Sequence, residues 1–165
     1  MRGVVVFGVL AMIALLLQTS VLPRASIGRA TPDLLLIMSV YLGLHQHSVP
    51  GAIGAFALGY LQDTFSGSIA GLNAFAMCVV FALVYLTSRR LWVDNAISKI
   101  VVVFLAAMVK TAVILALIVT FTASDGWAAL TVSTSMLQAV LTALMSPFIF
   151  AVLNRSLQPV EEEED

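Results

Sequence analysis

Residues 100–123, IVVVFLAAMVKTAVILALIVTFTA, form an apolar run that a single charged residue, Lys110, interrupts. A transmembrane α-helix needs about 20 consecutive, mostly apolar residues, and this run is long enough. Similar runs fill most of the chain, because 61% of its 165 residues are hydrophobic and only 10% are charged. So few charged residues cannot coat a water-soluble domain of this size. We therefore expect lipid to surround the chain.

The charge and the cysteine content further restrict the class of protein to which the chain can belong. The net charge is −1, but five of the nine acidic residues occupy positions 161–165. The remaining chain is mildly basic, which fits contact with lipid headgroups and does not suggest a nucleic-acid partner. The single cysteine, Cys78, excludes an intrachain disulfide. The apolar run that follows Arg2 lacks a clear small-x-small cleavage site, so we interpret it as an uncleaved first transmembrane helix.

The apolar runs predict an all-α integral membrane protein, a bundle of six transmembrane helices in one domain of residues 1–157. The second and third helices are short for a full crossing, and we interpret them as two short spans rather than a re-entrant hairpin. Thr31, Pro32 and Asp33 mark the start of the second helix, with the Thr31 hydroxyl as N-cap. The acidic segment 158–165 is predicted to be a disordered cytoplasmic tail. The predicted helices lie near residues 3–22, 32–45, 48–63, 69–88, 100–123 and 127–153.

The basic residues predict the orientation of the bundle. If the N-terminus lies in the cytoplasm, the inner side carries five basic residues and the outer side carries only Arg24 and Arg29. The positive-inside rule favours this arrangement, so we expect both termini in the cytoplasm. Trp92 and Trp127 would then lie at opposite membrane interfaces. The five inner basic residues are Arg2, Arg89, Arg90, Lys99 and Arg155.

Lys110 is the clearest polar residue inside a predicted span. We expect no acid at its depth, so its ammonium would lose a proton, draw in water or reach toward the interface. Two interpretations stay open: a hydrated pocket that contains Lys110, or a structural lysine bonded to Gln138 and to backbone carbonyls. If Lys110 is functional, Lys110→Leu should stabilise the fold by removing a buried charge.

Gln138 belongs to a stripe of polar residues at helical spacing on the last predicted helix. Such a stripe either faces protein or water, or makes helix–helix hydrogen bonds worth about 0.6–2 kcal/mol each. We favour helix–helix hydrogen bonds for the stripe, with Gln138 as the exception. Its members are Thr131, Ser135, Gln138, Thr142 and Ser146.

Gln62, Asp63 and Asn73 form a second polar group, because only a short turn separates the third predicted helix from the fourth. A carboxylate and two amides could bind a lipid headgroup, a small solute or a partner. Alternatively, Asp63 caps the following helix. A direct Asp63–Lys110 ion pair would need a strongly extended lysine or a break in its helix. We combine both groups into a candidate polar pocket of Gln62, Asp63, Asn73, Lys110 and Gln138.

Other motifs point to packing rather than to chemistry. Gly51, Ala55 and Gly59 form a small-xxx-small face that permits close approach of another helix, inside the bundle or on another chain. The His45-x-His47 pair is a weak metal signal without an evident third ligand, so we predict no metal site. The sequence contains no HExxH, Gly-rich phosphate loop or GxSxG motif. We therefore predict no catalytic residues, no cofactor and no enzymatic activity.

The order of segments in the first half of the chain resembles the rod shape-determining protein MreD family. The resemblance covers residues 18–73, and the second half is similar only in length, hydropathy and the basic Arg89-Arg90 connector. The acidic tail departs from the family pattern. The matching segments are LQTSVLP (17–23), TPDLLLIMSVYLGL (31–44) and GAIGAFALGYLQDTFSGSIAGLNAF (51–75), the most specific being Gly59-x-x-Gln62-Asp63-x-x-Ser66-Gly67 followed by Gly71-Leu72-Asn73.

The resemblance implies a non-enzymatic scaffold of the bacterial elongation (rod) complex in the inner, cytoplasmic membrane. It implies binding to MreC, in a higher-order assembly, and regulation of peptidoglycan synthesis and cell shape. RodA, a class B penicillin-binding protein, MreB and membrane lipid are the further partners that it implies. The implied fold is similar to the substrate-binding subunits of energy-coupling-factor transporters. That similarity leaves a second hypothesis open, namely a solute- or lipid-binding membrane subunit.

Overall fold

The computed structural model describes residues 2–21, 31–46, 49–67, 70–88, 95–122 and 128–157. Within these ranges the chain forms six α-helices and no strand, so the prediction of an all-α fold is confirmed. A short π-helical segment, η1 (Leu17–Val21), extends the first helix. The helices are α1 (Arg2–Leu16), α3 (Leu34–His45), α4 (Val49–Ser66), α5 (Leu72–Ser88), α6 (Ala96–Thr122) and α7 (Ala128–Leu157).

Among the residues that the structure describes, three helical segments are long and apolar enough to cross a membrane: Gly3–Ser20, Ala96–Thr120 and Ser135–Leu157. The helices Leu34–His45 and Leu72–Ser88 are also apolar but shorter. Each helix expected from the sequence has a counterpart, and the ends differ by a few residues. Length and composition thus indicate three membrane spans, and the six-span arrangement stays a prediction.

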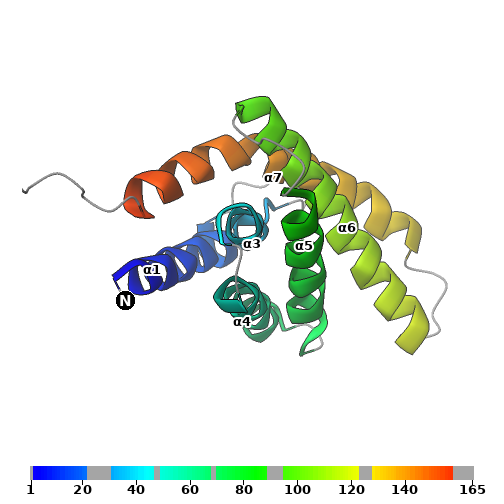
Figure 1. Cartoon of the computed structure of the whole chain (residues 1–165). Helices are drawn as coiled ribbons and strands as arrows, with labels where there is room; N and C mark the ends of the chain where they lie inside the picture. The colour runs from blue at the N-terminus through cyan, green and yellow to red at the C-terminus, as the bar shows by residue number, and fades with distance from the viewer. Residues whose placement is uncertain are drawn as a thin grey trace, which may run out of the picture.

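Helix α3 lies at the centre of the bundle, and α1, α4, α5, α6 and α7 all contact it. Figure 1 shows α3 nearly end-on, with α1, α4 and α5 around it and α7 running across. The side chains of residues 34–43 are all buried, and Ile37 and Val40 are 0% exposed. A helix that is apolar on every side suits this position, because no face of it meets the surroundings of the bundle.

The start of α3 differs from the sequence prediction. Asp33, and not Thr31, is the N-cap, and its Oδ1 accepts a hydrogen bond of 3.0 Å from the Leu36 backbone N–H. A carboxylate at this position satisfies an otherwise unpaired N–H of the first turn. Pro32 therefore precedes the helix. With the helix start shifted by two residues, Asp33 lies within the bundle, where the residue is 3% exposed.

The small residues Gly51, Ala55 and Gly59 are buried on the face of α4 that packs on α5. A Cβ atom added at Gly59 would lie 2.5 Å from the Ala74 Cα and 2.6 Å from the Asn73 backbone oxygen. One added at Gly51 would lie 3.0 Å from the Phe81 ring. The two backbones therefore approach most closely at Gly59.

Gly59→Ala is expected to destabilise the protein by about 1–3 kcal/mol, because the new methyl group overlaps backbone atoms and forces α4 and α5 apart. The midpoint of unfolding by sodium dodecyl sulfate in mixed micelles measures this loss. Gly54→Ala is the matched control, since its Cβ would meet only the end of the Leu42 side chain, at 2.9 Å. An equal effect of both substitutions would contradict the close approach at Gly59.

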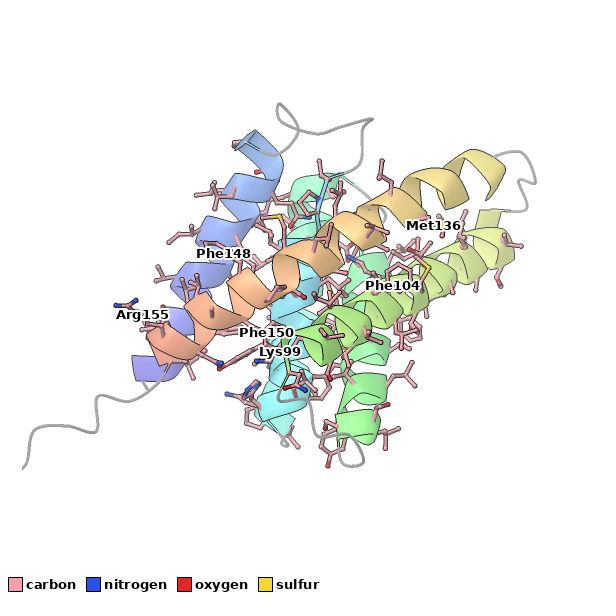
Figure 2. All side chains as sticks on the ribbon, turned by 90° about the horizontal axis from the view of Figure 1, so that it is seen from above. Lys99, Phe104, Met136, Phe148, Phe150 and Arg155 are labelled. Atoms are coloured by element: carbon pink, nitrogen blue, oxygen red, sulfur yellow. The ribbon has the colours of Figure 1, made fainter. Side chains whose placement is uncertain are left out.

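Large apolar side chains cover the outer faces of the helices. Among those that are at least half exposed are Val9 on α1, Phe56 on α4, Leu105 on α6, and Leu144 and Phe148 on α7. Figure 2 shows side chains of this kind along α6 and α7. Such surfaces suit lipid or other membrane helices and are costly in water.

Several sequence predictions concern residues outside the described ranges and stay predictions. They include the interfacial tryptophans, the second histidine of the His-x-His pair, the acidic tail and four of the basic residues used for orientation. These residues are Trp92, Trp127, His47, residues 158–165, Arg24, Arg29, Arg89 and Arg90.

Candidate functional site

The buried lysine of α6 forms an ion pair with the N-cap of α3. The Lys110 Nζ lies 2.5 Å from Asp33 Oδ2, and the two side chains are 8% and 4% exposed. The expectation that no acid lies at the depth of Lys110 is therefore wrong. Asp33 marks the start of α3, and this helix start is buried within the bundle.

Gln62 of α4 completes this group, which we call the lysine cluster (Asp33, Gln62 and Lys110). The Lys110 Nζ donates a hydrogen bond of 2.8 Å to Gln62 Oε1. The Gln62 Nε2 in turn donates to Asp33 Oδ2 at 3.3 Å. Each polar end of Gln62 thus bonds to one member of the ion pair. The lysine cluster consequently ties α3, α4 and α6 together.

Helix α7 joins the lysine cluster through Thr142. The Asp33 backbone N–H donates to Thr142 Oγ1 at 2.9 Å, and the Thr142 hydroxyl donates to the Gln138 backbone oxygen at 2.7 Å. Thr142 is 0% exposed, so both bonds are shielded from solvent. Polar contacts in such surroundings are costly to leave unmade. The start of α3 is therefore held by α4, α6 and α7.

Asp63 has a different role from Gln62. Its carboxylate accepts hydrogen bonds from the backbone N–H groups of Gly71, Asn73 and Ala74, at 2.9, 3.0 and 3.1 Å. It also accepts a bond of 2.9 Å from Asn73 Nδ2. Gly67 and Gly71 have positive φ values, of 63° and 95°, which let the chain turn back between the helices. Asp63 thus caps the start of α5, which is the alternative interpretation of this residue.

A cavity of about 210 Å³ lies beside the lysine cluster. Of the candidate pocket residues, Gln62, Asn73, Lys110 and Gln138 line it. Asp63 bonds to Asn73 and is not a lining residue. Asp33 and Thr142 also line the cavity, although they are not among the five residues predicted for the candidate pocket. Neighbouring lining residues are Leu36, Ser66, Ala107, Thr111, Ile114, Leu115, Ser135 and Ala139.

The residues of the polar stripe on α7 differ in their surroundings, since some line this cavity and one is buried inside the bundle. Ser135, Gln138 and Thr142 line the cavity. Ser146 is 0% exposed, and its hydroxyl donates to the Ala143 backbone oxygen at 2.7 Å. The side chain of Thr131 lies outside the described part of the structure. Three described members of the stripe, Ser135, Gln138 and Thr142, therefore face the cavity.

His45 lies at the other end of α3, away from the cavity. Its ring stacks on Tyr41 with 4.1 Å between ring centroids, and its Nδ1 lies 3.1 Å from the Tyr41 backbone oxygen. The Lys99 Nζ lies 5.6 Å from the centroid of the Phe150 ring, and Figure 2 shows these two residues side by side. Within the described ranges, no three His, Cys, Asp or Glu side chains are grouped as metal ligands would be.

Comparison with known proteins assigns the chain to a family. A family profile described as rod shape-determining protein MreD matches residues 1–156 of the 165-residue chain. No curated protein and no solved structure matches the chain. The matched region includes the six described helices except Leu157, the last residue of α7, and it contains the lysine cluster and the residues that line the cavity. The chain therefore belongs to the MreD family of rod shape-determining membrane proteins.

Proposed function

We propose that this protein is a non-enzymatic scaffold of the bacterial rod complex in the cytoplasmic membrane. In this role it binds MreC and helps to regulate peptidoglycan synthesis and cell shape. The observation that carries the proposal is the family match over residues 1–156. RodA, a class B penicillin-binding protein and MreB are the further partners that we propose for the same complex.

The surface of the bundle supports a scaffold that acts within the membrane. Exposed apolar side chains such as Val9 and Phe148 offer area for packing against another transmembrane helix. Helix association in lipid depends on such packing and on hydrogen bonds, because lipid chains are as apolar as the side chains. The proposed arrangement has six membrane spans and both termini in the cytoplasm, and its fold is similar to that of energy-coupling-factor substrate-binding subunits.

Co-purification with MreC tests the scaffold. We expect the full chain to retain MreC in a mild detergent, because the proposed contacts lie at the depth of the lipid chains. The matched control is MreC whose transmembrane helix is replaced by an unrelated apolar helix of the same length. Loss of MreC from the native pair, or equal retention of the control, would contradict the proposal.

A second candidate function, a solute-binding membrane subunit, draws support from the cavity beside Lys110. Sites for drug-sized ligands usually measure about 300–1,000 Å³. The cavity measures about 210 Å³, which is small for a vitamin-sized solute. We therefore favour the scaffold. Release of a stoichiometric vitamin-sized molecule from the denatured protein would reverse this preference.

A further inference from the structure

The lining of the cavity carries no net charge. Lys110 is its single cationic side chain and Asp33 its single anionic side chain, within the part of the chain that the structure describes. The two are paired directly. An anionic ligand would lie beside the Asp33 carboxylate, and a cationic ligand would lie beside the Lys110 ammonium. Both would meet a like charge at short range in poorly hydrated surroundings, which is unfavourable.

A purely apolar ligand fits the lining equally badly. The cavity contains amides from Gln62, Asn73 and Gln138, and hydroxyl groups from Ser135 and Thr142. An apolar ligand would leave the Gln138 side-chain amide and the third N–H of Lys110 without partners, because no described residue bonds to either. Leu36, Ile114 and Leu115 supply an apolar wall beside them. The lining therefore matches a ligand that is uncharged, polar and partly hydrocarbon.

Two lining side chains retain hydrogen-bonding capacity. An ammonium group has three N–H donors, and Asp33 and Gln62 accept two of those of Lys110. The Gln138 side-chain amide lines the cavity, and no described residue bonds to it. It offers both a donor and an acceptor. A hydroxyl group can complement both residues, because it accepts from Lys110 and exchanges a hydrogen bond with Gln138.

We propose that this cavity binds an uncharged, hydroxyl-bearing group of the size of glycerol or a single sugar ring. The volume of about 210 Å³ admits such a group and leaves little room for more. The group belongs either to a free solute or to the headgroup of a membrane glycolipid, and the chemistry of recognition is the same for both. The proposal goes beyond the scaffold function and does not depend on MreC.

Lipid binding to the purified full chain tests this site. The protein is prepared in a sugar-free detergent, lauryldimethylamine oxide, and native mass spectrometry measures the retained probe. The probes are monoglucosyl diacylglycerol and phosphatidic acid, with methyl β-glucoside as a soluble competitor. We expect the glucosyl lipid to bind at least about tenfold more tightly than phosphatidic acid, which is charged and lacks the sugar.

Gln138→Leu is expected to weaken binding of the glucosyl lipid by about tenfold, the effect of losing one well-formed hydrogen bond. Gln46→Leu is the matched control, because Gln46 is exposed at the opposite end of α3, and it should change binding less than about twofold. Leu115→Trp, which fills the cavity, should abolish binding. It serves as the second variant if Gln138→Leu does not fold.

The soluble competitor, methyl β-glucoside, distinguishes a free solute from a glycolipid headgroup as the source of the ligand. Displacement of the glucosyl lipid by methyl β-glucoside would support a free sugar as ligand, whereas Gln138-dependent lipid binding without displacement would support a glycolipid. Equal binding of the two lipids, unchanged binding after Gln138→Leu and Leu115→Trp, or no binding of either glucoside would overturn the proposal. Retention of MreC by the same variants would show that the scaffold function stands independently.

Discussion

Lys110→Leu is expected to lower the free energy of unfolding by about 3–5 kcal/mol, because it leaves the buried Asp33 carboxylate without its cation. The Asp33 side chain is 4% exposed and keeps only the Leu36 and Gln62 hydrogen bonds in this variant. The midpoint of unfolding in mixed dodecyl sulfate micelles measures the loss. The sequence alone suggests the opposite sign, since an unpaired lysine in lipid would be better replaced by leucine.

The double substitution Asp33→Asn with Lys110→Leu separates the ion pair from the helix cap. Asparagine keeps an oxygen that can accept from the Leu36 N–H, and it carries no charge. We therefore expect the double variant to be more stable than Lys110→Leu alone. Together with Asp33→Asn alone, the three variants give the coupling energy between the two sites.

Lys99→Met is the matched control for the loss of a lysine. The Lys99 ammonium lies over the Phe150 ring near the start of α6, and such contacts are worth about 0.5–2 kcal/mol. A change no larger for Lys110→Leu than for Lys99→Met would show that the Asp33–Lys110 pair contributes little to the fold.

The helices could be predicted from the sequence because their signal is local. Runs such as residues 100–123 are apolar over more than the length of one membrane crossing, and glycine, proline and charged residues interrupt the runs. The turn after Ser66 also follows from local chemistry, since Gly67 adopts a positive φ that few other residues tolerate. Such features need no knowledge of how the helices are arranged.

The lysine cluster could not be predicted in the same way, because it depends on the relative depth of separate helices. Asp33 and Lys110 are 77 residues apart, and the sequence around either residue does not predict that it contacts the other. With Thr31 as the predicted N-cap, Asp33 would also stand two residues after the cap, whereas Asp33 is the cap itself. Only the burial of the start of α3 against α4, α6 and α7 brings the carboxylate to the lysine. A search for an acid at any predicted helix start would have found the candidate.

Gln62 and Asp63 show that two adjacent polar residues on one helix can have different roles, which their proximity in the sequence does not predict. The two are adjacent in sequence, and the sequence predicts both in one candidate pocket. Gln62 bonds to the ion pair, whereas Asp63 turns toward the first turn of α5. Neighbouring residues on a helix differ in direction by about 100°, so one of them can face a cavity while the other caps a helix.

Asp63→Ala is expected to lower the free energy of unfolding by about 2–4 kcal/mol. The substitution removes the acceptor of three backbone N–H groups and of the Asn73 side-chain amide at the start of α5. Loss of a helix cap alone costs about 0.5–2 kcal/mol, and a buried donor without a partner costs about 1–3 kcal/mol more. Unfolding in mixed dodecyl sulfate micelles again provides the measurement.

Two further variants identify the cause of this loss. Asp63→Asn keeps one acceptor oxygen and should have an intermediate effect. Thr64→Ala, at the next position, removes an exposed hydroxyl that donates to the Tyr60 backbone oxygen, and should change stability by no more than about 0.5 kcal/mol. If Asp63→Ala unfolded at the same dodecyl sulfate content as Thr64→Ala, the start of α5 would not need its carboxylate cap. The close packing of α4 on α5 at Gly59 would then hold this corner of the bundle by itself.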